Sequence, residues 1–218
     1  MLRSLPQHYW HATALHYIPY LLSIGCLYSQ EELRRRGMPV RPRPTATRRD
    51  RKLRLSGFIH LSFTAQTPLL SDKRTRGFPH AMIAFDAALA EEPNAAYLPY
   101  NAKSWRHRDD FAPIREAMGK AEFLAKWQRG RYPSAELLIE TALPLAPHAR
   151  GVHLASAAEE VWLRALMSTC DLVSPVPITV SPELFPAGPE PDLAPYTAYS
   201  ADCAVARGLL APPDLPFD

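Results

Sequence analysis

The placement of proline sets the first limit on how this chain can fold. Residues 174–218 hold 10 of the 23 prolines in the sequence. Proline fixes φ and lacks an amide hydrogen, so a stretch this rich in proline is poorly suited to helices or strands. We therefore predict one folded domain over residues 1–173 and a proline-rich arm over residues 174–218. Apolar side chains of the arm are expected to pack against the domain, namely Leu184, Phe185, Tyr196, Tyr199 and Phe217, with a disordered tail as the alternative.

The rest of the chain is long enough for a full hydrophobic core. It has 218 residues in all, of which 47% are hydrophobic, and this excludes disorder over the whole length. The three cysteines, Cys26, Cys170 and Cys203, form no CxxC pair, which argues against a disulfide scaffold and a cysteine-based zinc site. No apolar run approaches the roughly 20 residues that span a bilayer, and the first residues lack the pattern of a signal peptide. A cytoplasmic protein without membrane contact is predicted.

Hydrophobic periodicity predicts a mixture of strands and helices. A turn is expected at Thr67-Pro68, a helix stub followed by a loop over residues 30–56, and irregular structure over residues 94–105. Strands are predicted at 8–13, 58–63, 80–85, within 134–145 (one or two) and at 152–154, and helices at 18–27, 110–129 and 157–166.

Basic residues are concentrated in the first third of the chain. Residues 1–76 carry 14 Lys and Arg against 4 Asp and Glu, whereas residues 77–218 carry 11 against 18. Most of the excess lies between Arg34 and Arg54, and nearly all of it is arginine, the better bidentate partner for phosphate. This segment is predicted to contact phosphates of a nucleic acid or a dinucleotide, with a solvated basic loop as the alternative.

Several common catalytic motifs are absent from the sequence. It contains no GxGxxG, GxxxxGK[ST], HExxH or GxSxG, so the Rossmann, P-loop, zincin and α/β-hydrolase classes lose their usual support. His8, His11 and His16 lie close together, but no acidic residue accompanies them, and no metal is expected.

The sequence contains four blocks with shared features: Tyr-Trp-His-Ala-Thr at 9–13 with Ile-Pro-Tyr-Leu-Leu-Ser-Ile-Gly-Cys-Leu at 18–27, Arg-Arg-Asp-Arg at 48–51, His-Leu-Ser-Phe-Thr-Ala-Gln-Thr-Pro-Leu-Leu at 60–70, and Ser-Ala-Glu-Leu-Leu-Ile at 134–139. In this order and spacing, the blocks resemble the DarT family of DNA ADP-ribosyltransferase toxins, relatives of the poly(ADP-ribose) polymerases. Two departures stand out: the segment between Arg51 and Phe58 is shorter than in the family, and Gln66 occupies the position of the arginine in the family's turn.

The resemblance implies an α+β ADP-ribosyltransferase fold with two small mixed β-sheets around an NAD cleft and flanking helices. It implies NAD as a substrate, a base in single-stranded DNA as acceptor, and an antitoxin protein as a possible partner. A base in a duplex hides its acceptor nitrogen in pairing, which favours single strands. RNA as acceptor, and a non-catalytic nucleic-acid-binding module of the same fold, are the alternatives.

The resemblance also points to the catalytic residues. Glu136 matches the family's catalytic glutamate, and a strand carboxylate can accept a hydrogen bond from a ribose hydroxyl and take the acceptor's proton. Glu140 points to the same face, so the pattern alone does not choose between the two. Arg49 matches an essential arginine of the family, expected to act on NAD or at the reacting centre. Arg51 and Arg54 are rivals for this role and candidates for nucleic-acid contacts.

Three more side chains are expected to bind NAD. His11 and Thr13 lie two apart on a predicted strand, so both face the same side and can hydrogen-bond the nicotinamide ribose or its amide. Phe63, or else Tyr97, is a candidate to stack on nicotinamide, although aromatic residues beside strands commonly belong to the core.

Overall fold

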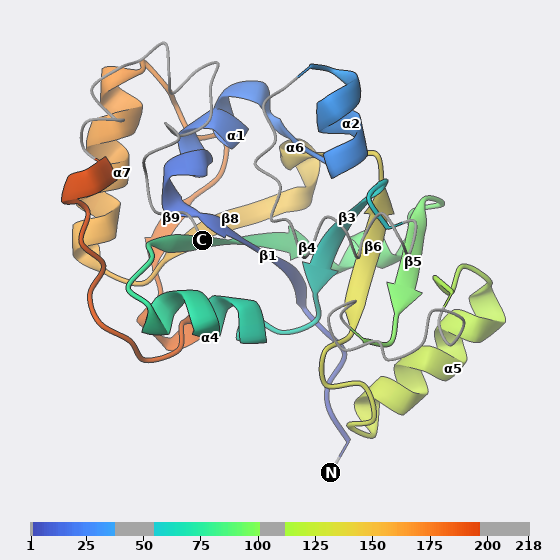
Figure 1. Ribbon diagram of the computed structural model, residues 1–218. Coiled ribbons are helices and arrows are strands. Elements are labelled where there is room, and N and C mark those ends of the chain that lie inside the picture. Colours follow the sequence, from blue (N-terminus) through green and yellow to red (C-terminus); the bar gives the residue numbers. More distant parts are fainter. Residues whose placement is uncertain (1, 38–54, 101–111, 197–218) are drawn as a thin grey trace.

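The computed structural model describes residues 2–37, 55–100 and 112–196. Its centre is a seven-stranded sheet in the order β5-β6-β3-β1-β4-β8-β9, in which only β8 and β9 run parallel to each other (Figure 1). A second sheet pairs β2 with β7. The strands are β1 (His8–Ala14), β2 (Cys26–Tyr28), β3 (Phe58–Ser62), β4 (His80–Asp86), β5 (Ala95–Leu98), β6 (Glu136–Glu140), β7 (Ala142–Pro144), β8 (Ala149–Leu154) and β9 (Ile178–Val180).

Helices cover both faces of the large sheet and its ends (Figure 1). Within the described residues, no helix is long and apolar enough to cross a membrane. The α-helices are α1 (Ile18–Ile24), α2 (Gln30–Arg35), α4 (Pro68–Thr75), α5 (Ala117–Gln128), α6 (Leu145–His148) and α7 (Ala157–Thr169), and the short 3-10 helices are η1 (Leu15–Tyr17), η2 (Ala87–Glu91) and η4 (Pro182–Leu184).

The two faces of the sheet are buried to different extents. One face, which includes Leu61 and Leu137, packs with α1, α5 and α7 in the main hydrophobic core. Smaller apolar clusters cover the other face, one of them formed by Leu70 of α4 with Met82 and Phe185. Because strand residues alternate between faces, polar residues of β3 and β6 all project to this second, less densely covered face. The candidate catalytic glutamate is among them.

The pairing along the sheet is uneven at β1. This strand pairs with β4 over its whole length, from His8 opposite Asp86 to Ala14 opposite His80. Its register with β3 consists of a single position, Trp10 opposite Ser62. The sheet therefore consists of a β5-β6-β3 part and a β1-β4-β8-β9 part that meet along a narrow seam.

The predicted α+β architecture is confirmed, with two sheets of very different size instead of two small ones. Residues 95–98 form β5, although irregular structure was expected there. All four side chains are buried, so the segment lacks the alternation of polar and apolar residues that marks a half-buried strand. Thr67 caps a helix by accepting a hydrogen bond from the Leu70 amide at 3.1 Å, so the predicted turn is the start of α4. The helix expected from residue 110 begins at Ala117 in the described part of the chain.

The first part of the proline-rich arm joins the folded structure. Residues 178–180 contain no proline and form β9, the parallel edge strand, so the expectation that the arm lacks regular structure is wrong there. Farther along, Phe185 and Tyr196 are buried, and the Tyr196 ring stacks on His16 with centroids 5.4 Å apart. The division at residue 173 stays a prediction about folding units.

Candidate active site

Glu136 is the first residue of β6, a strand with neighbours on both sides. Its register partners are Ser62 on β3 and Leu98 on β5, and the residue is only 8% exposed. A buried carboxylate needs hydrogen-bond donors or a positive partner to offset the loss of water. Its Oε2 atom lies 2.8 Å from Nδ1 of His60, a half-buried residue of β3. Glu136 is therefore held at the end of a strand fixed on both edges.

His60 also contacts the predicted NAD-side histidine, through its backbone. Nδ1 of His11 lies 3.2 Å from the carbonyl oxygen of His60. A carbonyl oxygen only accepts, so the hydrogen of a neutral His11 ring lies on Nδ1 and its Nε2 atom is an acceptor. Burial lowers the pKa of His11 below its ordinary value, so the neutral ring predominates at neutral pH.

The alternation of β1 places His11 and Thr13 differently from Glu136. Both residues share a face with Tyr9, which belongs to the main core, whereas Trp10 is paired with Ser62 on the face of Glu136. The structure thus connects His11 to Glu136 through His60, where the two parts of the sheet meet. Thr13, two residues after His11 on β1, is half-buried. An NAD contact for Thr13 stays a prediction.

Glu140 has a different environment from Glu136. It ends β6 opposite Phe58, and its Oε1 atom lies 2.5 Å from Nη2 of Arg115. Its side chain is 43% exposed. Exposed ion pairs of this kind are common on protein surfaces and contribute little to stability. Of the two candidate glutamates, Glu136 is the one that is buried and in contact with a histidine.

Phe63 lies in an aromatic cluster of the main core and is only 5% exposed. Its ring centroid is 5.0 Å from that of Tyr9 and 5.2 Å from that of Trp127. Tyr97 belongs to the same cluster and stacks on Phe123 at 4.8 Å. Stacking of either ring on nicotinamide requires the cluster to open, so this role stays a prediction.

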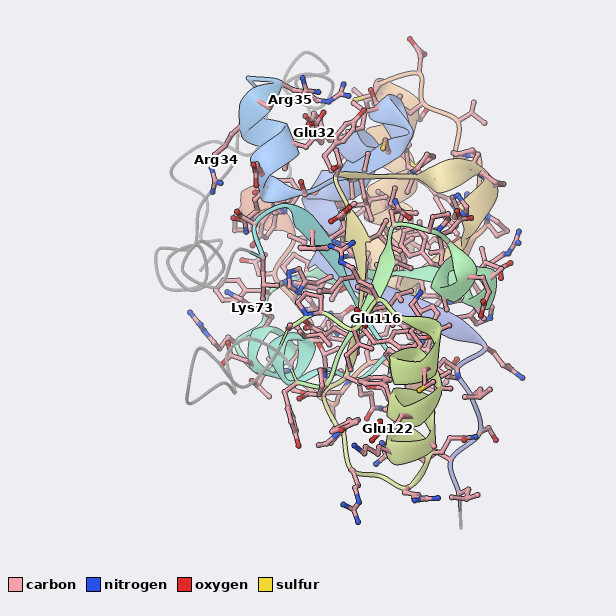
Figure 2. All side chains as sticks on the ribbon, turned by 90° about the vertical axis from the view of Figure 1, so that its right-hand side faces the viewer. Glu32, Arg34, Arg35, Lys73, Glu116 and Glu122 are labelled. Carbon is pink, nitrogen blue, oxygen red and sulfur yellow. The ribbon has the colours of Figure 1, made fainter. Side chains whose placement is uncertain are left out.

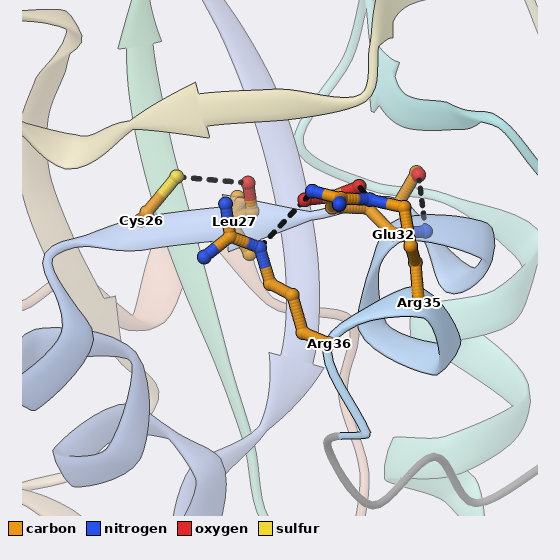
Figure 3. Close-up of polar contacts among 6 residues, drawn as sticks. Cys26, Leu27, Glu32, Arg35 and Arg36 are labelled. Carbon is orange, nitrogen blue, oxygen red and sulfur yellow. Dashed lines mark hydrogen bonds and ion pairs between the residues drawn. The ribbon is translucent and has the colours of Figure 1, made fainter.

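Arg49, Arg51 and Arg54 lie outside the described residues, and their roles stay predictions. The arginines of α2 are described, and they are engaged in contacts with the same helix. Arg35, and Arg36 directly after the helix, converge on the buried Glu32, to which Arg35 donates two hydrogen bonds and Arg36 one, each 2.6 Å long (Figure 3). These bonds lower the pKa of Glu32 to about 2.

Arg34 is oriented differently from its two neighbours. It is exposed and points outward from α2, bonded only weakly, at 3.2 Å, to Gln30 (Figure 2). Of the three arginines, Arg34 thus presents the charge that is easiest for a phosphate to reach.

His60 is the site residue that the sequence did not single out. The residues of β3 alternate between apolar Ile59 and Leu61 and the more polar His60 and Ser62, which was a signal for one polar face. Finding its partner required the register between β3 and β6, strands separated by more than 70 residues. Within the described residues, no group of three or more His, Cys, Asp or Glu side chains has the arrangement of a metal site.

The chain is similar to known proteins in structure, whereas comparisons of its sequence found no match. No protein-family model matches the chain, and no curated protein matches it significantly. Thermosipho africanus DarTG in complex with ADP-ribose is similar in structure, with a TM-score of 0.64 and 16% identity over 82% of this chain. The matched region spans 51% of the DarTG chain, so this chain corresponds to about half of that protein.

Two structures of Thermus sp. 2.9 DarT match over nearly their full length. The complex with ADP-ribosylated ssDNA has a TM-score of 0.63 and 15% identity, with 85% of this chain and 100% of that chain covered. The complex with NAD+ has a TM-score of 0.59 and 15% identity, with 83% and 98% covered. The chain therefore has the DarT-like ADP-ribosyltransferase fold that the sequence blocks predicted.

Proposed function

We propose that this protein is an NAD-dependent ADP-ribosyltransferase that modifies a base in single-stranded DNA. The observation that carries the proposal is the buried Glu136 at the start of β6, with its Oε2 atom 2.8 Å from His60 Nδ1. His11, which projects from the other face of the sheet, is bonded to the backbone carbonyl oxygen of the same histidine. A carboxylate and a neutral imidazole in this arrangement match the needs of ADP-ribosyl transfer, on a fold shared with proteins solved with NAD+ and with ADP-ribosylated ssDNA.

In the proposed reaction, the bond between ribose C1′ and nicotinamide breaks, and its electron pair goes to the pyridine nitrogen. Nicotinamide is already cationic in NAD, so its departure needs no general acid, unlike the leaving group of an ordinary glycoside. The ribose gains positive charge, which a nearby carboxylate stabilises. A base nitrogen then forms the new bond to C1′ and gives its proton to Glu136. Glu136 thus has both an electrostatic role and a general-base role.

Binding of NAD is assigned to side chains of β1 and of the basic segment between Arg34 and Arg54. Nε2 of His11 is the acceptor nitrogen of its ring, so it is suited to a ribose hydroxyl or the nicotinamide amide. The Thr13 hydroxyl is proposed as a second contact on the same strand, and Arg49 as the pyrophosphate contact or a group at the reacting centre. Arg51 and Arg54, with the outward-pointing Arg34, are proposed to bind the nucleic-acid backbone. As in the toxins it resembles, an antitoxin protein would counteract the activity.

The test is mass spectrometry of oligonucleotides after incubation with the protein and NAD. Single-stranded DNA of mixed sequence is expected to gain one ADP-ribose unit per modified base, and duplex DNA is expected to gain much less. RNA of the same sequence is incubated in parallel, and the relative yields of modified DNA and RNA show which of the two is the acceptor. Unmodified oligonucleotides together with salt-sensitive binding would instead support a non-catalytic binding module.

A further inference from the structure

We infer that His60 is a positioning residue for Glu136 and fixes the direction of its carboxylate during transfer. The inference rests on the proposed function, because it assigns His60 a part in that reaction. It goes beyond the predicted site, in which residue 60 has no role.

The contact is a charge-assisted hydrogen bond in a partly buried place. His60 Nδ1 donates to Glu136 Oε2 at 2.8 Å, and the side chains are 27% and 10% exposed. Hydrogen bonds to an ionised carboxylate are shorter and stronger than those between neutral groups. A donor that engages Oε2 fixes the carboxylate plane and thereby orients its other oxygen. That direction decides whether the carboxylate meets a ribose hydroxyl or the acceptor base.

The sheet register brings the two side chains together. On the antiparallel strands β3 and β6, His60 is opposite Leu138, and Glu136 is opposite Ser62. His60 and Glu136 are therefore diagonal neighbours on one face, a relation that long side chains bridge readily. Because β6 is also paired with β5, both backbones are fixed by the ladder. The geometry does not depend on a loop.

The two contacts of His60 can be separated by substitution. Glu136 is contacted by the imidazole, whereas His11 is contacted by the backbone carbonyl. A change of side chain at position 60 removes the first contact and leaves the second in place. The expected effect is therefore on the rate of the chemical step and not on the affinity for NAD.

The experiment compares two substitutions of His60 with a matched control. His60→Leu replaces the imidazole with an apolar side chain of similar size and so removes the donor. His60→Asn places an amide nitrogen close to the position of Nδ1. His153→Leu is the control, because His153 is also a half-buried strand residue with a 2.9 Å bond from Nδ1, in its case to Ser181. Single-turnover transfer to DNA, the KM for NAD, and the thermal unfolding of each variant are measured.

His60→Leu is expected to lower the transfer rate by about 10- to 100-fold with the KM for NAD nearly unchanged, as for a lost hydrogen bond to a charged group. His60→Asn is expected to regain most of this loss, and His153→Leu to stay within about twofold of wild type. Equal rates for His60→Leu and wild type would overturn the inference and leave the proposed function intact. A wild-type chain that transfers nothing would overturn the proposed function, and this inference with it.

A spectroscopic measurement covers the case in which His60→Leu does not fold. In the folded wild-type protein, proton NMR of the imidazole is expected to show a downfield Nδ1 hydrogen on His60, held by the carboxylate. The signal is expected to disappear in Glu136→Ala. Its persistence in that variant would show that another group holds the ring, and would refute the positioning role.

Discussion

Two of the buried glutamates, Glu159 and Glu136, have surroundings that are opposite in kind. Glu159, at the start of α7, is fully buried, and its Oε1 atom lies 2.5 Å from Nη1 of Arg74 in α4. Its Oε2 atom accepts the backbone amide of Ala155 at 2.8 Å. Glu136 instead has a histidine as partner, and that histidine is partly open to solvent.

Burial alone does not separate the two carboxylates, of which one has a structural partner and the other a proposed catalytic role. Arginine stays charged at every accessible pH and holds Glu159 in a single state, which suits a permanent tie between two helices. A single histidine nitrogen holds one oxygen of Glu136, which suits a carboxylate that must be oriented and must also meet the substrate. We therefore expect substitution of Glu159 to affect stability and substitution of Glu136 to affect chemistry.

The largest effect is expected for Glu136→Gln. The amide keeps the shape of the side chain but cannot take a proton, so transfer should fall by about 10³-fold, the usual contribution of a general base. Transfer is measured by mass spectrometry of DNA, and NAD binding by calorimetry. Affinity for NAD and the melting temperature should change little. Wild-type transfer rates in this variant would contradict the assignment.

Glu159→Gln is the complementary change and should act on the fold. It leaves the buried Arg74 without a charged partner, and breaking such a pair costs about 3 kcal/mol or more of unfolding free energy. Chemical denaturation measures the loss. Below the unfolding transition, transfer per folded molecule should match wild type. A Glu159→Gln variant that is as stable as wild type but impaired in transfer would contradict the structural role of Glu159.

Removal of residues 186–218 should have a smaller effect, and this effect should be on stability and not on transfer. The arm packs close to α4, where a Cβ atom on Gly188 would lie 2.6 Å from the Arg74 carbonyl oxygen, and it buries Tyr196 against His16. Loss of the Tyr196 contacts should lower the unfolding free energy by about 2 kcal/mol, with transfer still detectable. Rapid proteolysis between Pro186 and Pro195 in the native protein, without loss of stability, would argue against a packed arm.

The smallest effect is expected for Glu140→Gln. Its ion pair with Arg115 is exposed, so stability should change by less than about 1 kcal/mol and transfer by less than about twofold. This variant is the matched control for Glu136→Gln, with the same chemical change four residues away on the same strand. If Glu140→Gln abolished transfer and Glu136→Gln did not, the catalytic role would move to Glu140.

Local patterns were sufficient to predict much of the fold. Alternation identified β1 and β3, a short apolar run identified β4, and the resemblance of residues 134–139 pointed to Glu136 ahead of Glu140. The edge strand β9 and the buried strand β5 were missed, because three residues between prolines and four consecutive buried residues lack the pattern of a half-buried strand.

The partner of Glu136 could not be predicted in the same way. Its contact with His60 depends on the pairing of strands about 75 residues apart, and such pairing is fixed by tertiary packing and not by local sequence. The different neighbours of Glu136 and Glu140, a histidine in one case and an exposed arginine in the other, were likewise not visible in the sequence.

The single paired position between β1 and β3 has a consequence for how the molecule fluctuates. Few backbone hydrogen bonds cross that seam, so the two parts, or units, are joined chiefly by side chains of the core that they share, and we expect amides along the seam to exchange faster than those within either unit. His60 and Glu136 belong to one unit, and His11 and Thr13 belong to the other. A dinucleotide held by both would tie the units together, and its binding energy would then appear as slower amide hydrogen exchange along the seam.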